Sequence, residues 1–197
     1  SWSGMPLRSA KANLDLAAAV IPQIQEAGAS VTGQLSTTMH FGNHEEGLGL
    51  FGEKWAYMWT DVLLGPPPCT AAEEVSQRNA DGSLVWRTIK GRPYRTYRGC
   101  MSNPKWLAVL KAMVRKGIEV GLDGFNATHH YESLCHCQYC CDYARSYLSN
   151  RLTVEEINGI FGVSDLAQVD DVLSAAPDSS EPAIARLKLV LAQGSDL

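Results

Sequence analysis

The chain has 197 residues, of which 45% are hydrophobic and 19% are charged, and its formal net charge is −4 at pH 7. This composition excludes a disordered polypeptide, because enough apolar surface is present to build a core. No run of 18 apolar residues and no signal-peptide pattern is found, so we expect no membrane segment and a cytoplasmic location. The acidic balance argues against nucleic acid as a partner, although residues 90–98 interleave basic residues with Tyr.

The first half of the chain predicts a helix followed by extended segments. Apolar residues recur at helical spacing over residues 10–27, and Gly28 ends this helix before a predicted strand over residues 31–40. A second apolar run over residues 55–64 predicts another strand, and alternating aromatic and β-branched residues over 82–98 predict a hairpin.

The second half repeats the order of helix, Gly turn and strand. Asn103 and Pro104 are typical of a helix start, and Gly121 separates that helix from a short strand over residues 122–128. Further helices are predicted over residues 137–150, over 153–162, where Thr153 and Glu156 form a capping box, and over 180–193.

Strands that alternate with helices indicate an α/β fold with parallel β/α units of the TIM-barrel type. Three or four strands are too few for a closed barrel, which usually needs about 250 residues. We therefore predict one partial barrel domain over residues 1–197, with a zinc-bound excursion around 99–150. Because a small parallel sheet leaves edges and faces uncovered, we expect the chain to be an oligomer or part of a longer chain.

The cysteines point to a metal. The segment CHCQYCC over residues 135–141 has the spacing C-x-C-x-x-C, and three such thiolates can share a tetrahedral zinc with a fourth ligand from elsewhere. Cys100 is the best candidate, because it precedes the helix that leads into the strand before this segment. Cys69, His136 and Cys141 are the alternatives. Four sulfur ligands would close the site and make the zinc structural.

The same region resembles a known family. The motifs CMSNPKW at 100–106, GLDGF at 121–125 and CHCQYCCDYARSYL at 135–148 resemble a block of (β/α)8-barrel glycoside hydrolases, in particular the family 42 β-galactosidases and their uncharacterised relatives. The resemblance covers residues 99–163, and residues 10–65 in general pattern. It implies a domain that hydrolyses or binds a β-linked sugar, and a structural zinc bound by four cysteines: Cys100, Cys135, Cys137 and Cys140.

The catalytic residues are less well defined by this resemblance. Family members place a carboxylate at the end of the strand before the cysteine loop, where this chain has FNATHH over residues 125–130. The candidates for catalysis are Glu132, His129 and Asp61. The candidates for sugar binding, at strand ends or on a predicted strand, are His40, Asn126, His130 and Trp59.

Two readings of the whole chain follow. The first is a glycoside hydrolase-like domain with carbohydrate as its partner. The second is a non-catalytic, zinc-stabilised assembly or interaction module, in which an apolar sheet edge pairs with a partner chain. The missing carboxylate at residues 126–128 favours the second reading, and the cysteine block favours the first.

Overall fold

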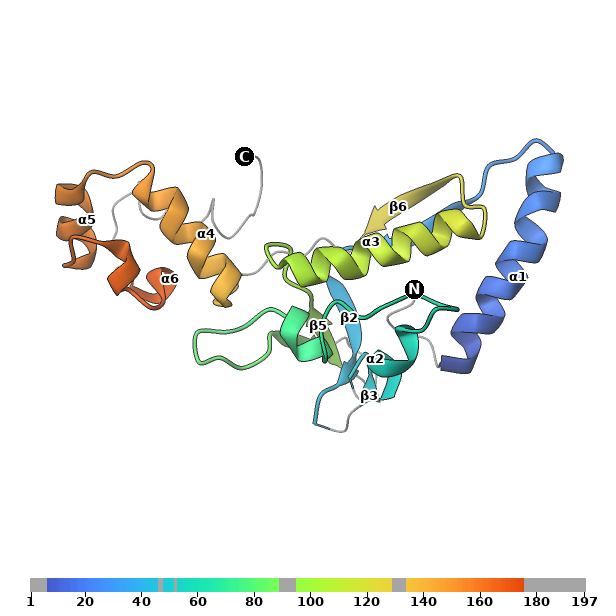
Figure 1. Ribbon diagram of the computed structural model, residues 1–197, viewed down its shortest axis with the longest axis horizontal. Coiled ribbons are helices and arrows are strands. Elements are labelled where there is room, and N and C mark those ends of the chain that lie inside the picture. The colour runs from blue at the N-terminus through green and yellow to red at the C-terminus, as the bar shows by residue number, and fades with distance from the viewer. Residues whose placement is uncertain (1–6, 46–47, 52, 89–94, 129–133, 176–197) are drawn as a thin grey trace. The chain divides into compact units, whose positions relative to one another are not determined.

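The computed structural model describes residues 7–45, 48–51, 53–88, 95–128 and 134–175, and Figure 1 shows the ribbon. The chain divides into two compact units, and the fold is mixed α/β. The first unit combines residues 1–76 with 86–131, and the second combines 77–85 with 132–197. Among the described helices, none is both long enough and apolar enough to cross a membrane.

The first unit contains one parallel pair of strands. Helix α1 (Leu7–Glu26) precedes β1 (Thr32–Ser36), and helix α3 (Pro104–Glu119) precedes β6 (Gly124–Thr128), alongside which it lies in Figure 1. The two strands run parallel, with Thr32 opposite Gly124 and Ser36 opposite Thr128. Two helix-to-strand steps, separated in the chain by the elements from β2 to β5, therefore place β1 and β6 side by side in the same direction.

Asp123 fixes the starting point of both strands. Its Oδ2 accepts a hydrogen bond of 2.7 Å from the Val31 amide, and its own amide donates to the Val31 carbonyl. Its Oδ1 accepts from the Gln25 side chain at 2.9 Å. The hydrogen bonds from Val31 and then Gln25 lower the pKa of Asp123. The ionised carboxylate thus satisfies donors of the turn between α1 and β1 and sets the register of the pair.

Two glycines, one on α3 and one on β1, leave room for the side chains of Leu122 and Phe125. A Cβ added to Gly117 of α3 would lie 2.5 Å from Cζ of Phe125, and a Cβ added to Gly33 of β1 would lie 2.6 Å from Leu122. Both distances are far shorter than a van der Waals contact. The Phe125 ring therefore occupies space that any larger residue at position 117 would fill.

The first unit also contains an antiparallel sheet, and among the described residues its strand order is β3-β2-β5-β4. Its strands are β2 (Met39–Asn43), β3 (Leu48–Gly49), β4 (Trp86–Thr88) and β5 (Arg95–Arg98). Aromatic side chains form the core beside it, and the indole of Trp106 donates a 2.8 Å hydrogen bond to the Thr37 carbonyl. This bond ties α3 to the segment between β1 and β2.

The second unit consists mainly of helices: α4 (Gln138–Ser149), α5 (Val154–Phe161), the 3-10 turn η2 (Leu166–Gln168) and α6 (Val172–Ala175). The predicted capping box of α5 is present, and Gly162 ends that helix in the left-handed region with φ of 71°. A buried apolar cluster joins these helices: Cys141, Ala144, Leu148, Ile157, Leu166, Val172 and Leu173.

Several predicted elements are confirmed, and the predicted strand over residues 55–64 is wrong. The first helix, the strand at β6, the hairpin strands β4 and β5, and helices α3 to α5 form where the sequence predicts them. Residues 55–64 do not form a strand, because Glu53–Met58 is helix α2. Trp55, Met58 and Trp59 are all buried, and this i, i+3, i+4 spacing is helical. The predicted helix over 180–193 lies outside the described residues.

The expected sheet also differs from the structure. We expected three or four parallel strands, whereas two described strands pair in parallel and four form an antiparallel sheet. The described strands close no barrel. Residues 31–40, taken as one strand, bend into β1 and β2, so that β2 pairs with β5 rather than extending the parallel pair. The single-domain assignment of residues 1–197 stays a prediction.

The packing of α3 predicts opposite effects for two Gly-to-Ala substitutions in helices. Gly117→Ala should destabilise the protein, because overpacking costs about 1–3 kcal/mol and exceeds the gain in helix propensity. Gly159→Ala in α5 has nothing within 4 Å of the added Cβ and should stabilise by roughly 0.5–1 kcal/mol. Urea unfolding of both variants measures this difference. A Gly117→Ala variant as stable as the wild type would contradict the packing argument.

Candidate metal centre

Three cysteines lie at the start of α4, in the second unit. Cys137 is the N-cap residue, with extended backbone, and its carbonyl accepts hydrogen bonds of 3.0 Å from the amides of Cys140 and Cys141. Cys137 and Cys140 are three residues apart in this turn, so their side chains lie on the same side of it. Cys135 precedes the helix and is buried.

The segment 77–85 supports this loop from the same unit. The amide of Arg78 donates to Sγ of Cys135 at 3.4 Å, and the carbonyl of Arg78 accepts from the amide of His136 at 2.9 Å. Arg78 also forms an isolated antiparallel bridge with Leu84. The backbone of residue 78 therefore holds the cysteine loop at Cys135 and at His136, and it offers an N–H donor to the sulfur.

Cys100 belongs to the first unit and is 1% exposed. Its amide donates to the Val75 carbonyl at 2.9 Å, and the amide of Gly99 donates to the Thr38 carbonyl. Gly99 lies directly against the Trp106 indole, where an added Cβ would be 2.0 Å from Cε2. These backbone hydrogen bonds and the Trp106 indole together fix the position of the Cys100 backbone.

The Sγ atoms of Cys100, Cys135, Cys137 and Cys140 all lie within 4.8 Å of one another. A tetrahedral zinc with Zn–S bonds of about 2.3 Å would hold its sulfurs about 3.8 Å apart, so a small contraction fits this donor set to the ion. Cys100 and Cys135 are buried and the other two are partly buried. None of the six cysteines, all of which the structure describes, forms a disulfide.

The three alternative ligands have other partners. Sγ of Cys69 donates to the Ala71 carbonyl at 3.4 Å, and Nδ1 of His136 lies 2.6 Å from Oδ2 of Asp171. Sγ of Cys141 lies 3.4 Å from Oδ1 of Asp171. Burial, and then the charge of Asp171, raise the pKa of Cys141 to about 12. The structure thus brings Cys100, rather than an alternative, to the other three sulfurs.

The other candidate site residues lie on different elements. His40 on β2 is fully buried, with Nε2 3.2 Å from Oγ of Ser76 and its ring stacked on Tyr97. Trp59 is 8% exposed. Asp61, which follows α2, and Asn126 on β6 are both exposed. The remaining candidates, His129, His130 and Glu132, lie outside the described residues, so the catalytic and sugar-binding roles stay predictions.

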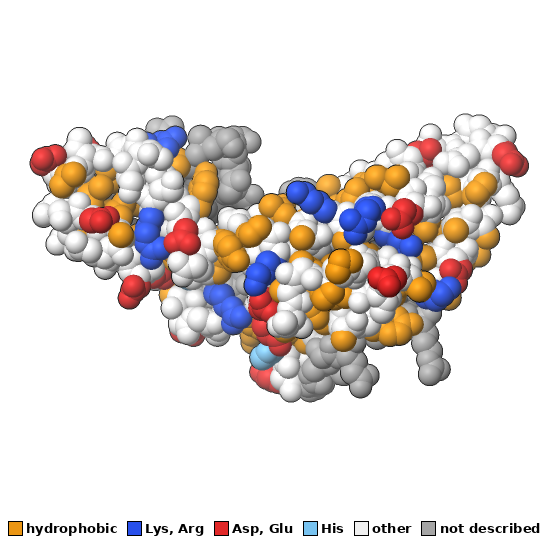
Figure 2. Space-filling view, viewed as in Figure 1, with side chains coloured by type: hydrophobic (Ala, Val, Ile, Leu, Met, Phe, Trp, Pro, Cys, Tyr) orange, Lys and Arg blue, Asp and Glu red, His pale blue; other side chains and the backbone are white. Residues whose placement is uncertain are grey.

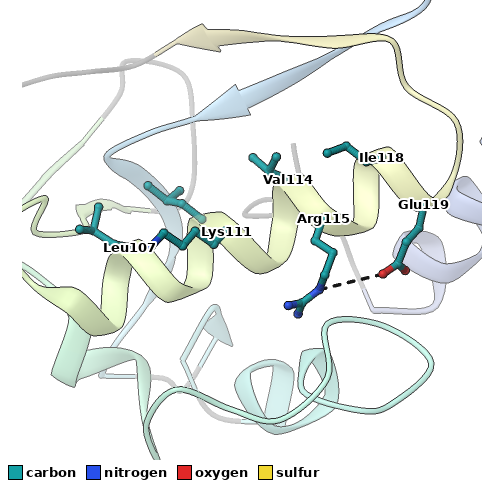
Figure 3. Close-up of a pocket in the computed structure, with 7 residues that line it drawn as sticks. Leu107, Lys111, Val114, Arg115, Ile118 and Glu119 are labelled. Carbon is teal, nitrogen blue, oxygen red and sulfur yellow. Dashed lines mark ion pairs between the residues drawn. The ribbon is translucent and has the colours of Figure 1, made fainter.

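A cavity of about 420 Å³ lies along α3 in the first unit. Figure 3 shows Val114 and Ile118 on one side of the helix, and Arg115 paired with Glu119 at 4.0 Å. In the space-filling view of Figure 2, hydrophobic side chains gather over α3 with basic side chains among them. Among the described residues that line this cavity there is one carboxylate, Glu119, whereas glycoside hydrolysis needs two. The described lining therefore does not supply the pair of carboxylates of a glycosidase site.

Comparison with known proteins adds no relative to this description. No family model, no curated protein and no solved structure matches the chain. The chemistry of the metal centre is therefore argued from the residues of the chain itself.

Asp171 and Arg78 contact the cysteine loop but were not among the sequence-based candidates. Asp171 carried a usable signal, because an Asp directly before Val172 and Leu173 is a typical helix N-cap, and its Oδ1 does accept from the amides of Leu173 and Ser174. Arg78 contacts the cysteine loop through its backbone amide, which every residue except proline has. The residue type at position 78 therefore gave no signal in the sequence.

Glu74 links the segment before Cys100 to the start of α3. It lies in the 3-10 turn η1 (Ala72–Val75), where its Oε1 accepts from the amide and hydroxyl of Thr70 and its Oε2 accepts from Lys105 at 2.5 Å. Its carbonyl accepts from the Asn103 side chain. The hydrogen bond from Lys105, and then that from the Thr70 side chain, lower the pKa of Glu74 to about 2.

Glu74→Gln should lower stability at pH 7 and flatten its dependence on acid pH. A carboxyl whose pKa falls on folding stabilises the protein above its unfolded pKa, near 4.5, and this stabilisation is lost as pH falls toward 2. Because the ion pair is about one-third exposed, screening limits the loss to roughly 1 kcal/mol. Thermal unfolding from pH 7 to pH 2 measures it, with Glu26→Gln at the end of α1 as the control. A wild-type advantage that persists at pH 2 would contradict this assignment.

Proposed function

We propose that this chain binds one zinc ion through the thiolates of Cys100, Cys135, Cys137 and Cys140. The observation that carries the proposal is the convergence of their four sulfurs within 4.8 Å. Four protein thiolates fill the tetrahedral coordination of zinc, so no position is left for water or substrate. The ion is therefore structural.

The surroundings of the loop suit a negatively charged cluster. Four thiolates around Zn²⁺ carry a net charge of −2, and the start of α4 presents the positive end of its helix dipole to Cys137 and Cys140. The Arg78 amide adds an N–H donor at Cys135. These dipoles come from backbone groups that are already oriented, so they stabilise the charge without introducing a cationic side chain.

We further propose that the chain acts on, or binds, a β-linked sugar as a glycoside hydrolase-like domain with an incomplete barrel. The parallel strands β1 and β6, each preceded by a helix, support this proposal, as does the position of the cysteine loop after β6. The resemblance of residues 99–163 to family 42 β-galactosidases points the same way. In this interpretation the catalytic candidates are Glu132 and His129, which follow β6 in the sequence, and Asp61, which follows α2. Asn126 on β6 is exposed and would bind sugar.

The alternative is a non-catalytic, zinc-stabilised assembly module, and a specific observation favours it. The last residues of β6, Ala127 and Thr128, include no carboxylate. Within the described residues, the parallel sheet has two strands, and each has an edge that does not pair in that sheet. Such edges pair readily with another chain. The partner would then be a second copy of this chain or another chain.

Zinc binding predicts a simple stoichiometry. Elemental analysis of the purified chain should give one zinc per chain, and replacing any of the four cysteines by Ser should reduce it. Cys69→Ser, which removes a thiol outside the cluster, should leave the zinc in place. Removal of zinc by a chelator should destabilise residues 99–150 by several kcal/mol, because the free energy of metal binding is partly free energy of folding. Absence of zinc, or disulfides among the four cysteines, would refute the proposal.

The proposed activity is tested with aryl β-glycosides. We expect the zinc-loaded chain to release the aryl group from at least one β-linked substrate, and Glu132→Gln to abolish this activity. Glu26→Gln is the control for the removal of an exposed carboxylate. No turnover across a panel of sugars would instead support the assembly module, and light scattering would then show whether the chain self-associates.

A further inference from the structure

Asp171, at the start of α6, uses both carboxylate oxygens within the second unit. Oδ2 lies 2.6 Å from Nδ1 of His136 and accepts a 2.8 Å hydrogen bond from the Ser174 hydroxyl. Oδ1 accepts from the amides of Leu173 and Ser174 and lies 3.4 Å from Sγ of Cys141. The amides of α6 therefore orient a carboxylate that faces the cysteine loop.

The two loop residues that Asp171 contacts lie next to three of the metal ligands. His136 stands between Cys135 and Cys137, and Cys141 directly follows Cys140. The amide of His136 is held independently by the Arg78 carbonyl. Both ends of the segment Cys135–Cys141 are thus fixed, one through an imidazole ring and the other through a thiol.

The contact with Cys141 fixes the rotation of the first turn of α4. Cys141 is buried in the apolar cluster of the second unit, and successive residues in a helix point about 100° apart. Cys140 also packs against this cluster but is only partly buried, and its Sγ lies within 4.8 Å of the other three sulfurs, whereas the thiol of Cys141 is buried beside Asp171. The contact with Asp171 therefore keeps a competing sulfur away from the other ligands while the adjacent Cys140 joins them.

We propose that Asp171 is the positioning residue of the metal centre: through His136 and Cys141 it holds the loop in its ligating conformation and excludes Cys141 from the ligand set. This inference rests on the proposed zinc site and names the residue that holds its ligand loop in position. Outer-shell partners of metal ligands typically contribute 10-fold to 100-fold to metal affinity. Asp171 acts one residue farther away, through neighbours of the ligands, but it acts on both ends of the loop.

The first test compares zinc affinities by competition with a chromophoric chelator. Asp171→Ala should weaken zinc binding about 10-fold to 100-fold, and Asp171→Asn, which keeps the shape and an acceptor oxygen, should restore part of the loss. Leu173→Ala, in the same apolar cluster, is the matched control for a general loss of stability. His136→Ala should reproduce the effect of Asp171→Ala, and the double variant should lose little more than either one.

The second test reads the ligand set with Co²⁺ in place of zinc, because sulfur-to-cobalt absorption reports the coordinated thiolates. Cys141→Ser should leave the spectrum of the otherwise wild-type protein unchanged, and it should change the spectrum when Asp171 is Ala. The inference is overturned if Asp171→Ala binds zinc no more weakly than Leu173→Ala, or if Cys141→Ser alters the wild-type spectrum. A wild-type chain that binds no zinc overturns the proposed function as well, whereas normal zinc binding by Asp171→Ala overturns this inference alone.

Discussion

The sulfurs of four cysteines lie within 4.8 Å of one another, and four thiolates at such distances would repel strongly unless a cation lay among them. The ligands come from separate parts of the sequence, so the fold has to hold each sulfur by groups that do not themselves need the metal. Backbone hydrogen bonds do this at Cys100 and Cys135, and the helix start does it at Cys137 and Cys140. Side chains of Glu74 and Asp171 then hold the neighbouring turns.

The parts of the fold that were predictable are those decided by neighbouring residues. Asn103 accepts the amide of Lys105 and begins α3, and Thr153 and Glu156 form the capping box of α5, because caps depend on contacts only a few residues apart. The C-x-C-x-x-C spacing likewise identifies three converging thiols before any fold is known. These features needed no information about distant segments.

The rest depended on contacts between distant segments. An apolar run such as residues 55–64 fits either a buried helix or a buried strand, and only the core around Trp55 favours the helix. The choice of Cys100 over Cys69 required the pairing that brings Gly99 beside Thr38. His40 follows a strand-like segment, as a ligand-binding histidine would, yet it packs among aromatic rings because β2 turns to pair with β5.

Gly99 and Trp106 have a consequence for how this sequence can vary. The indole occupies the space of a Cβ at position 99, and it also donates the hydrogen bond that ties α3 to Thr37. Any residue other than glycine at 99 would displace the ring, and Cys100 is bonded directly to that residue. Position 99 can therefore accept a side chain only when position 106 takes a smaller one. Among homologous chains the two positions should change together, as a covarying pair beside the first cysteine of the cluster.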